Sequence, residues 1–455
     1  MHQIMTLTKE LCDIKSGVVC DGNEALFRRI GDELPLKIFR YESGQRHNGW
    51  IVPDKWSVRE ANIYKDDKLL YDGTVNALGV AQYSRSFEGE LDLETLKKHL
   101  FSIPSLPDAH VFHCNWLYRP WENGWGFCPP HRFVDSLKPG KYRVSLKTTF
   151  EPGEMLVAHH HIPGKSDNTI VFQSNTCHPH MANDGFSGTA VMIRFFQWLS
   201  ERDNYYSYRL ILCPEHLGTV FYLRDHTASE IDTYLAGVFG EMMGTDGDMV
   251  VASTFKGEEV IDRAFRHIVA QTTTKHRFLG FRESVGNDET VWEAPGYEIP
   301  FVQVNRFQTH SEPFWGYHTN YDNIDIIKPE LLEEFFIVFQ GVIELLENNV
   351  LMHRKFDGLV ALSNPEYDIY LERFDPSKSA IRDNEYNNKW GVLQDSVVRY
   401  FEGNMSVLDI AEKHDLNFFD VRQYIQKFAD KDLIDISLQQ IRRTPAQRVA
   451  LEESK

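Results

Sequence analysis

The chain has 455 residues, of which 42% are hydrophobic and 25% charged, and its formal net charge is −18. This is ordinary globular composition, so wholesale disorder is excluded, and the acidic balance disfavours a nucleic-acid partner unless basic residues cluster. The sequence has no Cys-x-x-Cys pair, no run of 18 apolar residues and no basic segment leading into an apolar run at its start. We therefore expect a cytoplasmic protein of about three domains, without a structural zinc knuckle, a membrane span or a secretory signal.

The pattern of apolar residues changes twice over the first 355 residues. Residues 1–40 have helical spacing, as at Leu7, Leu11 and Ile14. Residues 46–150 contain short aromatic and β-branched runs separated by Gly, Pro and Asp, which predicts a mostly β domain. Residues 151–355 alternate short apolar runs with helical patterns. This alternation predicts an α/β fold whose mainly parallel sheet is flanked by helices, with functional residues at the carboxyl ends of the strands.

The last hundred residues have a different organisation. Residues 356–385 are rich in Pro, Asn, Asp and Lys and are predicted to be a linker. Residues 386–455 contain three short amphipathic patterns and a predicted strand, which favours a winged-helix-like domain. Acidic residues flank Arg422, Lys427 and Lys431 in its third helix. We therefore expect this helix to make a packing or oligomer contact rather than to bind DNA.

The segment SNTCHPHMANDGFSGTA, residues 174–190, follows a predicted strand and opens a predicted helix. His178 and Asp184 are nitrogen and oxygen ligands of the kind that Zn²⁺ accepts. Gly185 and Gly188 permit a tight turn with the backbone close to a bound group. The alternative is an ordinary loop with a helix N-cap, because Asp and Ser favour that position.

Two carboxylates follow later predicted strands. Glu215 lies in ILCPEHLGT, and a buried carboxylate needs either a partner or a function. Near a metal, it would accept a proton from water and return it to a leaving amine. Its neighbour His216 is a ligand or a supporting residue, and the alternative is a carboxylate that starts a helix. Glu241 ends the strand in GVFGEMMGTD and is a conditional further ligand.

The remaining candidates lie between residues 280 and 325. His318, in GYHTNYDNID, is a candidate ligand, and Asp322 would orient an imidazole. A lone histidine here would otherwise be structural. Asp288 and Glu289 are candidates for binding a substrate amine, and Arg306 for binding a carboxylate. Solvated loop charge is an equally good alternative for Asp288 and Glu289, and a structural ion pair is one for Arg306.

The aromatic residues of the 46–150 domain have two interpretations. They cover the active-site cleft or stack on a sugar, or they form the compact core of a small β domain. The second interpretation is the simpler one for any single residue. The residues concerned are Tyr83, Trp116, Tyr118, Trp121 and Trp125.

The order of these motifs resembles that of the co-catalytic zinc aminopeptidases, whose superfamily also includes the glutaminyl cyclases. Almost the whole chain is similar to a bacterial aminopeptidase-like family with an inserted β domain and a C-terminal winged helix. The segments that carry this similarity are VPDKWSVREANI, WGFCPP, NTCHPHMANDGFSG, YRLILCPEHLGT and YHTNYDNID. The resemblance implies that 1–45 and 151–355 form one aminopeptidase-like domain around the insertion 46–150. It also implies Glu215 as general base and His178, Asp184, Glu241 and His318 as zinc ligands.

Two positions depart from that family pattern. The usual Glu-Glu pair is Glu215-His216 here, and the usual pair of acids before the Ser-Gly turn is Asn183-Asp184. If Asn183 occupies the bridging position, it cannot supply a bridging carboxylate. One zinc ion held by His178, Asp184 and His318, and a pair of zinc ions, therefore stay open alternatives.

The predicted function is zinc-dependent, aminopeptidase-like hydrolysis of an amide in a peptide or an amino-sugar conjugate. The resemblance adds a link to polysaccharide biosynthesis, because genes of the similar family often accompany such genes. The expected partner is a peptide or a small amide-bearing substrate, without nucleic acid or membrane, and a homo-oligomer stays open. The alternatives are a non-catalytic, metal-stabilised binding or regulatory protein that uses its winged helix, and a glutaminyl-cyclase-like transferase.

Overall fold

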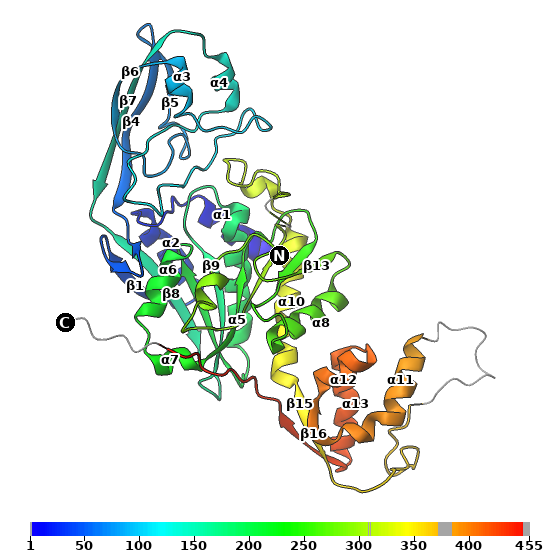
Figure 1. Cartoon of the computed structure of the whole chain (residues 1–455). Coiled ribbons are helices and arrows are strands. Elements are labelled where there is room, and N and C mark those ends of the chain that lie inside the picture. Colours follow the sequence, from blue (N-terminus) through cyan, green and yellow to red (C-terminus); the bar gives the residue numbers. More distant parts are fainter. Residues whose placement is uncertain (1, 308, 310, 372–384, 449–455) are drawn as a thin grey trace. The chain divides into compact units, whose positions relative to one another are not determined.

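The computed structural model describes residues 2–307, 309, 311–371 and 385–448 (Figure 1). It divides into two compact units. The first comprises Met1–Gly257, Lys275–Phe336 and Thr444–Lys455, and the second comprises Glu258–Thr274 and Ile337–Arg443. Among the described residues, no helix combines the length and the apolar character that crossing a bilayer requires.

An eight-stranded mixed sheet is the centre of the first unit, in the order β1-β8-β10-β9-β11-β14-β12-β13. The four middle strands β10, β9, β11 and β14 run parallel to one another. Every residue of β9, β11 and β14 is buried, as expected for strands covered on both faces. The predicted α/β fold with a helix-flanked mixed sheet is thus confirmed. The strands are β1 (Lys37–Glu42), β8 (Glu154–Ile162), β9 (Thr169–Asn175), β10 (Ser207–Cys213), β11 (Tyr234–Gly240), β12 (Met249–Ala252), β13 (His276–Leu279) and β14 (Phe301–Asn305).

Helices of the first unit pack on this sheet and on one another. α5 (Gly188–Ser200) begins within the 174–190 motif, packs on β9 and contacts α1 (His2–Cys12). The other helices are α2 (Gly22–Gly31), α6 (Leu217–Arg224), α7 (Ala228–Thr233), α9 (Glu289–Trp292) and the first part of α10 (Pro329–Asn348). The prediction of helix over 1–40 is wrong at its end, because residues from Lys37 onward form β1. This half-buried strand pairs antiparallel with β8, a contact that local spacing does not reveal.

The inserted segment forms a separate four-stranded antiparallel sheet, in the order β5-β4-β7-β6. Its strands are β4 (Lys55–Lys65), β5 (Lys68–Asp72), β6 (Phe87–Asp92) and β7 (Lys141–Glu151), with short helices α3 (Leu93–Lys97) and α4 (His131–Ser136). Ala61 and Ile63 alternate with more exposed residues on β4 and pack with Val144 and Leu146 of β7. A small hairpin, β2 (Arg46–His47) and β3 (Trp50–Ile51), precedes this sheet.

The second unit contains α8 (Val260–Thr272), the end of α10, and a three-stranded sheet in the order β16-β15-β17. Its other elements are β15 (Val350–Arg354), α11 (Glu385–Ser396), β16 (Glu402–Ser406), α12 (Val407–His414), α13 (Phe418–Asp430) and β17 (Ile434–Leu438). Ser406 and Asp409 form a capping box at the start of α12, and Arg263 of α8 pairs with Asp409. Of these elements, α11, β16, α12, α13 and β17 lie in the segment where the winged-helix-like domain is predicted, whereas α8, α10 and β15 precede it. Part of the predicted linker, 372–384, is outside the described residues.

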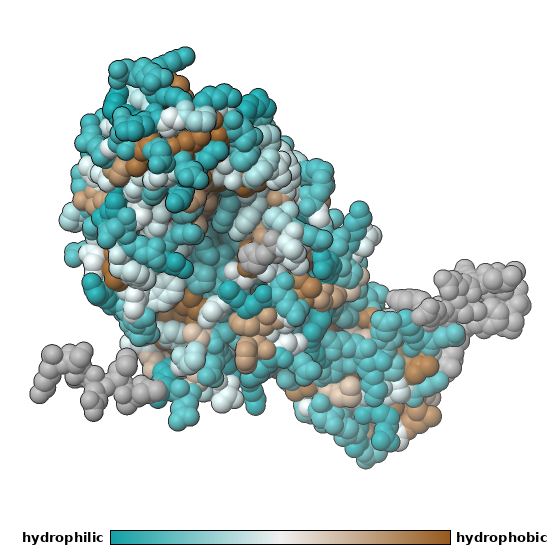
Figure 2. All heavy atoms as spheres, turned by 45° about the horizontal axis from the view of Figure 1, so that its top comes forward, coloured by the Kyte–Doolittle hydropathy of each residue, from teal (hydrophilic) through white to brown (hydrophobic). Residues whose placement is uncertain are grey.

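The surface agrees with the acidic, polar composition. Figure 2 shows a face that is largely hydrophilic, with separate hydrophobic patches of small size. Large side chains that are well exposed, such as Val75, Trp121 and Phe255, come from distant parts of the sequence. Isolated residues of this kind are normal on a protein surface and do not by themselves indicate an interface.

Candidate metal centre

The candidate residues come from four loops that follow the middle strands of the sheet. The loop after β9 carries His178 and Asp184, the loop after β10 carries Glu215, Glu241 follows β11, and the segment after β14 carries His318. Because β10, β9, β11 and β14 are parallel neighbours, their carboxyl ends lie at one edge of the sheet. The parallel topology thus gathers four segments that are far apart in the sequence.

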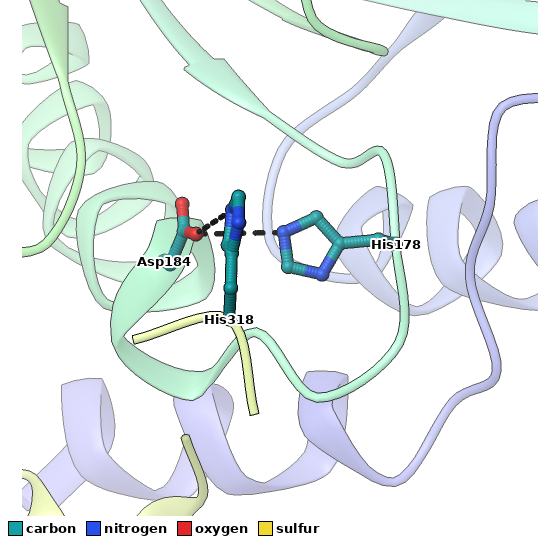
Figure 3. Close-up of side chains that lie close together, drawn as sticks. All are labelled: His178, Asp184 and His318. Atoms are coloured by element: carbon teal, nitrogen blue, oxygen red, sulfur yellow. Dashed lines mark ion pairs between the residues drawn. The ribbon is translucent and has the colours of Figure 1, made fainter. Parts of the chain in front are cut away.

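His178, Asp184 and His318 form a compact triad. The Nε2 atoms of His178 and His318 lie 3.5 and 3.2 Å from Oδ2 of Asp184. One ligand atom from each residue lies within 4.8 Å of the others, and the three side chains point toward one another (Figure 3). The side chains of His178 and Asp184 are buried, whereas His318 is 33% exposed. The triad is therefore open to solvent at His318.

The buried carboxylates around the triad fit a bound cation. Asp184 Oδ2 and Glu241 Oε2 are buried and accept no hydrogen bond from any described residue. Burial and the charges of Asp184 and Glu215 raise the pKa of Glu241 well above its usual range. Although burial opposes it, the adjacent imidazoles of His178 and His318 hold the pKa of Asp184 below its usual range. Two imidazole nitrogens and a carboxylate oxygen are a donor set suited to zinc.

His178 is oriented by its backbone surroundings. Its Nδ1 lies 2.9 Å from the carbonyl oxygen of Pro179. A carbonyl oxygen can only accept a hydrogen bond, so Nδ1 carries the proton. Nε2 is then the unprotonated nitrogen of the neutral ring, and it faces Asp184. Phe112 stacks on the ring at 4.3 Å, and Ser16 donates a hydrogen bond to the His178 carbonyl at 2.8 Å. These contacts fix the tautomer and the ring plane that a metal ligand needs.

The inserted segment holds the loop that carries His318. Phe112 N donates to His318 O at 2.7 Å, and Asn320 N donates to His110 O at 3.0 Å. The imidazole of His318 also stacks on Tyr317 at 3.9 Å. Residues 110–112 of the inserted segment therefore help to place a predicted metal ligand, and Val111 also forms an isolated β-bridge with Thr319.

Asp322 has a different role from the one predicted. Its oxygens accept the backbone N–H groups of Asn183 (2.7 Å) and Asp184 (3.0 Å), and no described imidazole donates to it. Burial and the charge of Asp184 raise the pKa of Asp322 to about 8. Asp322 thus anchors the turn that presents Asp184, instead of orienting a histidine ring.

The Asn183 side chain is not part of the triad. Its Oδ1 accepts from Gly244 N at 2.8 Å, and its Nδ2 donates to Thr245 at 3.1 Å. Both partners lie in the loop after β11, so Asn183 ties two of the site loops together. Glu241, the first residue of this loop, accepts from Asn287 at 2.9 Å and lies outside the compact triad.

Glu215 lies beside His216 and a tyrosine of the inserted segment. Its Oε1 is 3.3 Å from His216 Nδ1, and its Oε2 accepts from the Tyr118 hydroxyl at 3.3 Å. Burial favours the neutral forms of both groups. The interaction between Glu215 and His216 outweighs the effect of burial. The pKa of Glu215 is lowered, and the pKa of His216 is raised to about 9. Glu215 is therefore ionised near neutral pH and able to accept a proton.

The three predicted substrate-binding residues make structural contacts. Asp288 accepts the backbone N–H of His216 at 3.1 Å, and the pKa of its buried carboxyl is raised by that burial. Glu289 accepts from Asn287 N at 2.8 Å. Arg306 is buried, donates to Gly247 O at 2.6 Å and pairs with Glu334. Asp288 thus supports the Glu215–His216 loop, and Arg306 has the ion pair that was its structural alternative.

Two residues beside the site were not assigned to it from the sequence. Tyr118 belonged to an aromatic-rich segment that favours either a core or a cleft wall, and no local pattern places it beside Glu215. Phe112 carried no signal at all. Their contacts join residues 97 and 66 positions apart in the sequence, and only the packing of the inserted segment brings them together.

Comparisons with known proteins agree with this fold. A crystal structure from Clostridium acetobutylicum, of a provisionally assigned peptidase, matches with a TM-score of 0.79 and 23% identity, covering 96% of each chain. A zinc aminopeptidase from Bacillus subtilis matches with a TM-score of 0.56 and 13% identity, over 75% of this chain and 93% of that one. These two likenesses show that the chain has the fold of the aminopeptidases.

The family is shown by the sequence itself. Residues 5–349 match the family described as a domain of unknown function, DUF4910, and the chain belongs to this family. A relative from Clostridium acetobutylicum is 26% identical over 421 residues, which cover 91% of this chain and 92% of the relative. Its provisional name is polysaccharide biosynthesis protein with aminopeptidase-like domain.

Proposed function

We propose that this protein is a zinc-dependent amidohydrolase with aminopeptidase-like activity. The observation that carries the proposal is the His178–Asp184–His318 triad, whose Asp184 Oδ2 is buried, faces two imidazoles and lacks a hydrogen-bond donor. An ionised carboxylate, Glu215, follows the adjacent strand at the same edge of the sheet. A ligand set and a base at one edge are the parts that metal-assisted hydrolysis needs.

Each residue of the candidate site has its own role in the proposed amide hydrolysis. His178, Asp184 and His318 would hold a zinc ion, which supplies Lewis acidity toward a carbonyl and lowers the pKa of water. Glu215 accepts the proton of the attacking water and delivers it to the amine that leaves. Asp322 and Pro179 keep Asp184 and His178 in place.

The proposed substrate is a peptide or an amino-sugar conjugate with an amide bond. The aminopeptidase names of structurally similar proteins support amide chemistry, and the relative's name supports a connection with polysaccharide biosynthesis. The exposed side of the triad at His318 leaves a route for such a molecule. Hydrolysis of one amide is the reaction that we propose.

The test combines metal analysis with an activity screen on the purified full chain. We expect wild type to contain zinc, to hydrolyse members of a panel of aminoacyl anilides and amino-sugar amides, and to lose activity with a chelator. His178→Ala should lose zinc. Glu215→Gln should keep zinc and lose about 10²–10⁴-fold in kcat, the usual contribution of general acid–base catalysis.

Glu201→Gln, an exposed change at the end of α5, is the matched control and should behave as wild type. Absence of zinc from both wild type and His178→Ala would contradict the metal assignment. Full turnover by zinc-loaded Glu215→Gln would contradict the assignment of the base.

A further inference from the structure

Both oxygens of the Glu215 carboxylate are held by neighbouring side chains. His216 lies at Oε1, and Tyr118 of the inserted segment donates its hydroxyl to Oε2, each at 3.3 Å. The second distance is long for an O–H···O bond, as is common before a substrate tightens a catalytic site. Each oxygen keeps a further lone pair, so both contacts leave Glu215 able to accept a proton.

A third aromatic ring braces these two partners. Trp50 of β3 stacks on His216 with ring centroids 6.1 Å apart and an angle of 7° between the planes. It also meets Tyr118 edge-on, at 6.4 Å and 88°. Trp50 therefore limits the movement of both groups that contact the carboxylate.

The direction of the Tyr118 hydrogen bond is defined by the two groups. Burial and the nearby charge of Glu215 raise the pKa of Tyr118 well above its usual range, so its oxygen keeps the proton. Glu215 is ionised and can only accept. A phenol that donates to a carboxylate fixes the carboxylate's rotation about its terminal bond, which is otherwise soft.

We propose that Tyr118 is a positioning residue, through which the inserted segment fixes Glu215 for proton transfer. The inference rests on the proposed role of Glu215 as the base. It gives the inserted segment a function in the site beyond covering it. Displacement of a catalytic base by about 1 Å can lower the reaction rate about 100-fold, so a contact that holds Glu215 in place has a large effect on rate.

The first test is Tyr118→Phe in the full, zinc-loaded chain. The ring and its contact with Trp50 remain, and only the hydroxyl is lost. We expect kcat to fall about 10- to 100-fold while KM stays within about 2-fold and zinc content is unchanged. Val75→Ala, a change of an 83% exposed residue in the same inserted segment, is the control and should keep wild-type kinetics. An unchanged kcat, or a loss confined to KM or to zinc content, would overturn the inference.

The second test does not need activity. Tyr118→Phe, Glu215→Leu and the double variant are unfolded in urea, and the effect of losing the hydroxyl is compared with and without the carboxylate. If the two groups are coupled, the shift in unfolding midpoint caused by Tyr118→Phe should shrink in the Glu215→Leu background. Equal shifts in both backgrounds would overturn the inference. A wild type that binds zinc but cleaves no amide would instead overturn the proposed function, and the urea cycle then decides the Tyr118–Glu215 contact alone.

Discussion

All four loops around the candidate site contain a non-glycine residue with a positive φ angle. The φ angles are 54° at His180, 51° at His216, 52° at Met242 and 53° at His318. This conformation costs an L residue about 1–2 kcal/mol. It persists where surrounding contacts enforce it, as Asp288 does by accepting the N–H of His216. Such outliers gather at functional sites, and here each site loop has one.

Asp322 offers a prediction at the same scale. In Asp322→Asn, one acceptor oxygen becomes an amide NH₂, so the N–H of Asn183 or Asp184 loses its partner. We expect the unfolding free energy to fall by about 1–3 kcal/mol, the usual cost of a buried unpaired group. Zinc affinity should fall about 10- to 100-fold, as when the support of a metal ligand is removed.

Urea unfolding and competition with a zinc-chelating dye measure the two effects of Asp322→Asn. Asp325→Asn is the matched control, because Asp325 is an exposed residue of the same loop. Wild-type zinc affinity in Asp322→Asn would contradict the anchoring role.

At the scale of a single element, the β4–β5 hairpin has a strained turn. β4 and β5 form a hairpin whose two-residue turn, Asp66-Asp67, has φ angles of 49° and 58°. Positive φ at both turn residues is typical of a type I′ turn, which glycine at the second position favours. Asp67 is therefore not the residue that the backbone of this turn favours most.

This turn predicts a stabilising substitution. Asp67→Gly removes the left-handed strain and gives up only an exposed ion pair with Arg143 at 3.9 Å. We expect a local stabilisation of about 0.5–1 kcal/mol, which slows amide hydrogen exchange in β4 and β5 without changing exchange in the central sheet. Asp67→Ala, which keeps a Cβ at the strained position, is the comparison. Faster exchange in Asp67→Gly than in Asp67→Ala would show that the turn is not strained.

At the scale of the whole molecule, the triad links distant parts of the first unit. His178 and His318 are 140 positions apart and follow different strands, β9 and β14. A zinc ion bound to both would stabilise the folded state by mass action, by about 2.7 kcal/mol at a free concentration 100 times its dissociation constant.

We therefore expect zinc to raise the thermal unfolding temperature of wild type in calorimetry, and a chelator to reverse the rise. His318→Ala should lose most of this response, because it removes one of three ligands. His276→Ala, a change of a partly exposed histidine in β13, is the control, and zinc should stabilise it as strongly as wild type. A similar rise in His318→Ala and wild type would indicate that zinc acts elsewhere.

The order of local patterns along the sequence predicts the fold class, which the structure confirms, and the position of the candidate site. The alternation of apolar strands and helices predicts the sheet, because burial on both faces requires continuous apolar runs such as β9 and β11. Parallel strands then place their carboxyl ends together, so His178, Asp184 and His318 were predicted as neighbours although they are far apart in the chain. The structure brings these three residues into one triad.

Only the tertiary structure decided which partner each remaining polar residue has. Asp322 binds backbone N–H groups, Asn183 turns toward the loop after β11, and Asp288 supports His216. Tyr118 reaches Glu215 from a turn of the inserted segment. These contacts depend on loop backbone angles and on the packing of an inserted segment against the central sheet. Neither loop backbone angles nor the packing of the inserted segment produces a repeating pattern in the sequence. The burial of strands and helices does produce one, with periods of about 2 and 3.6 residues.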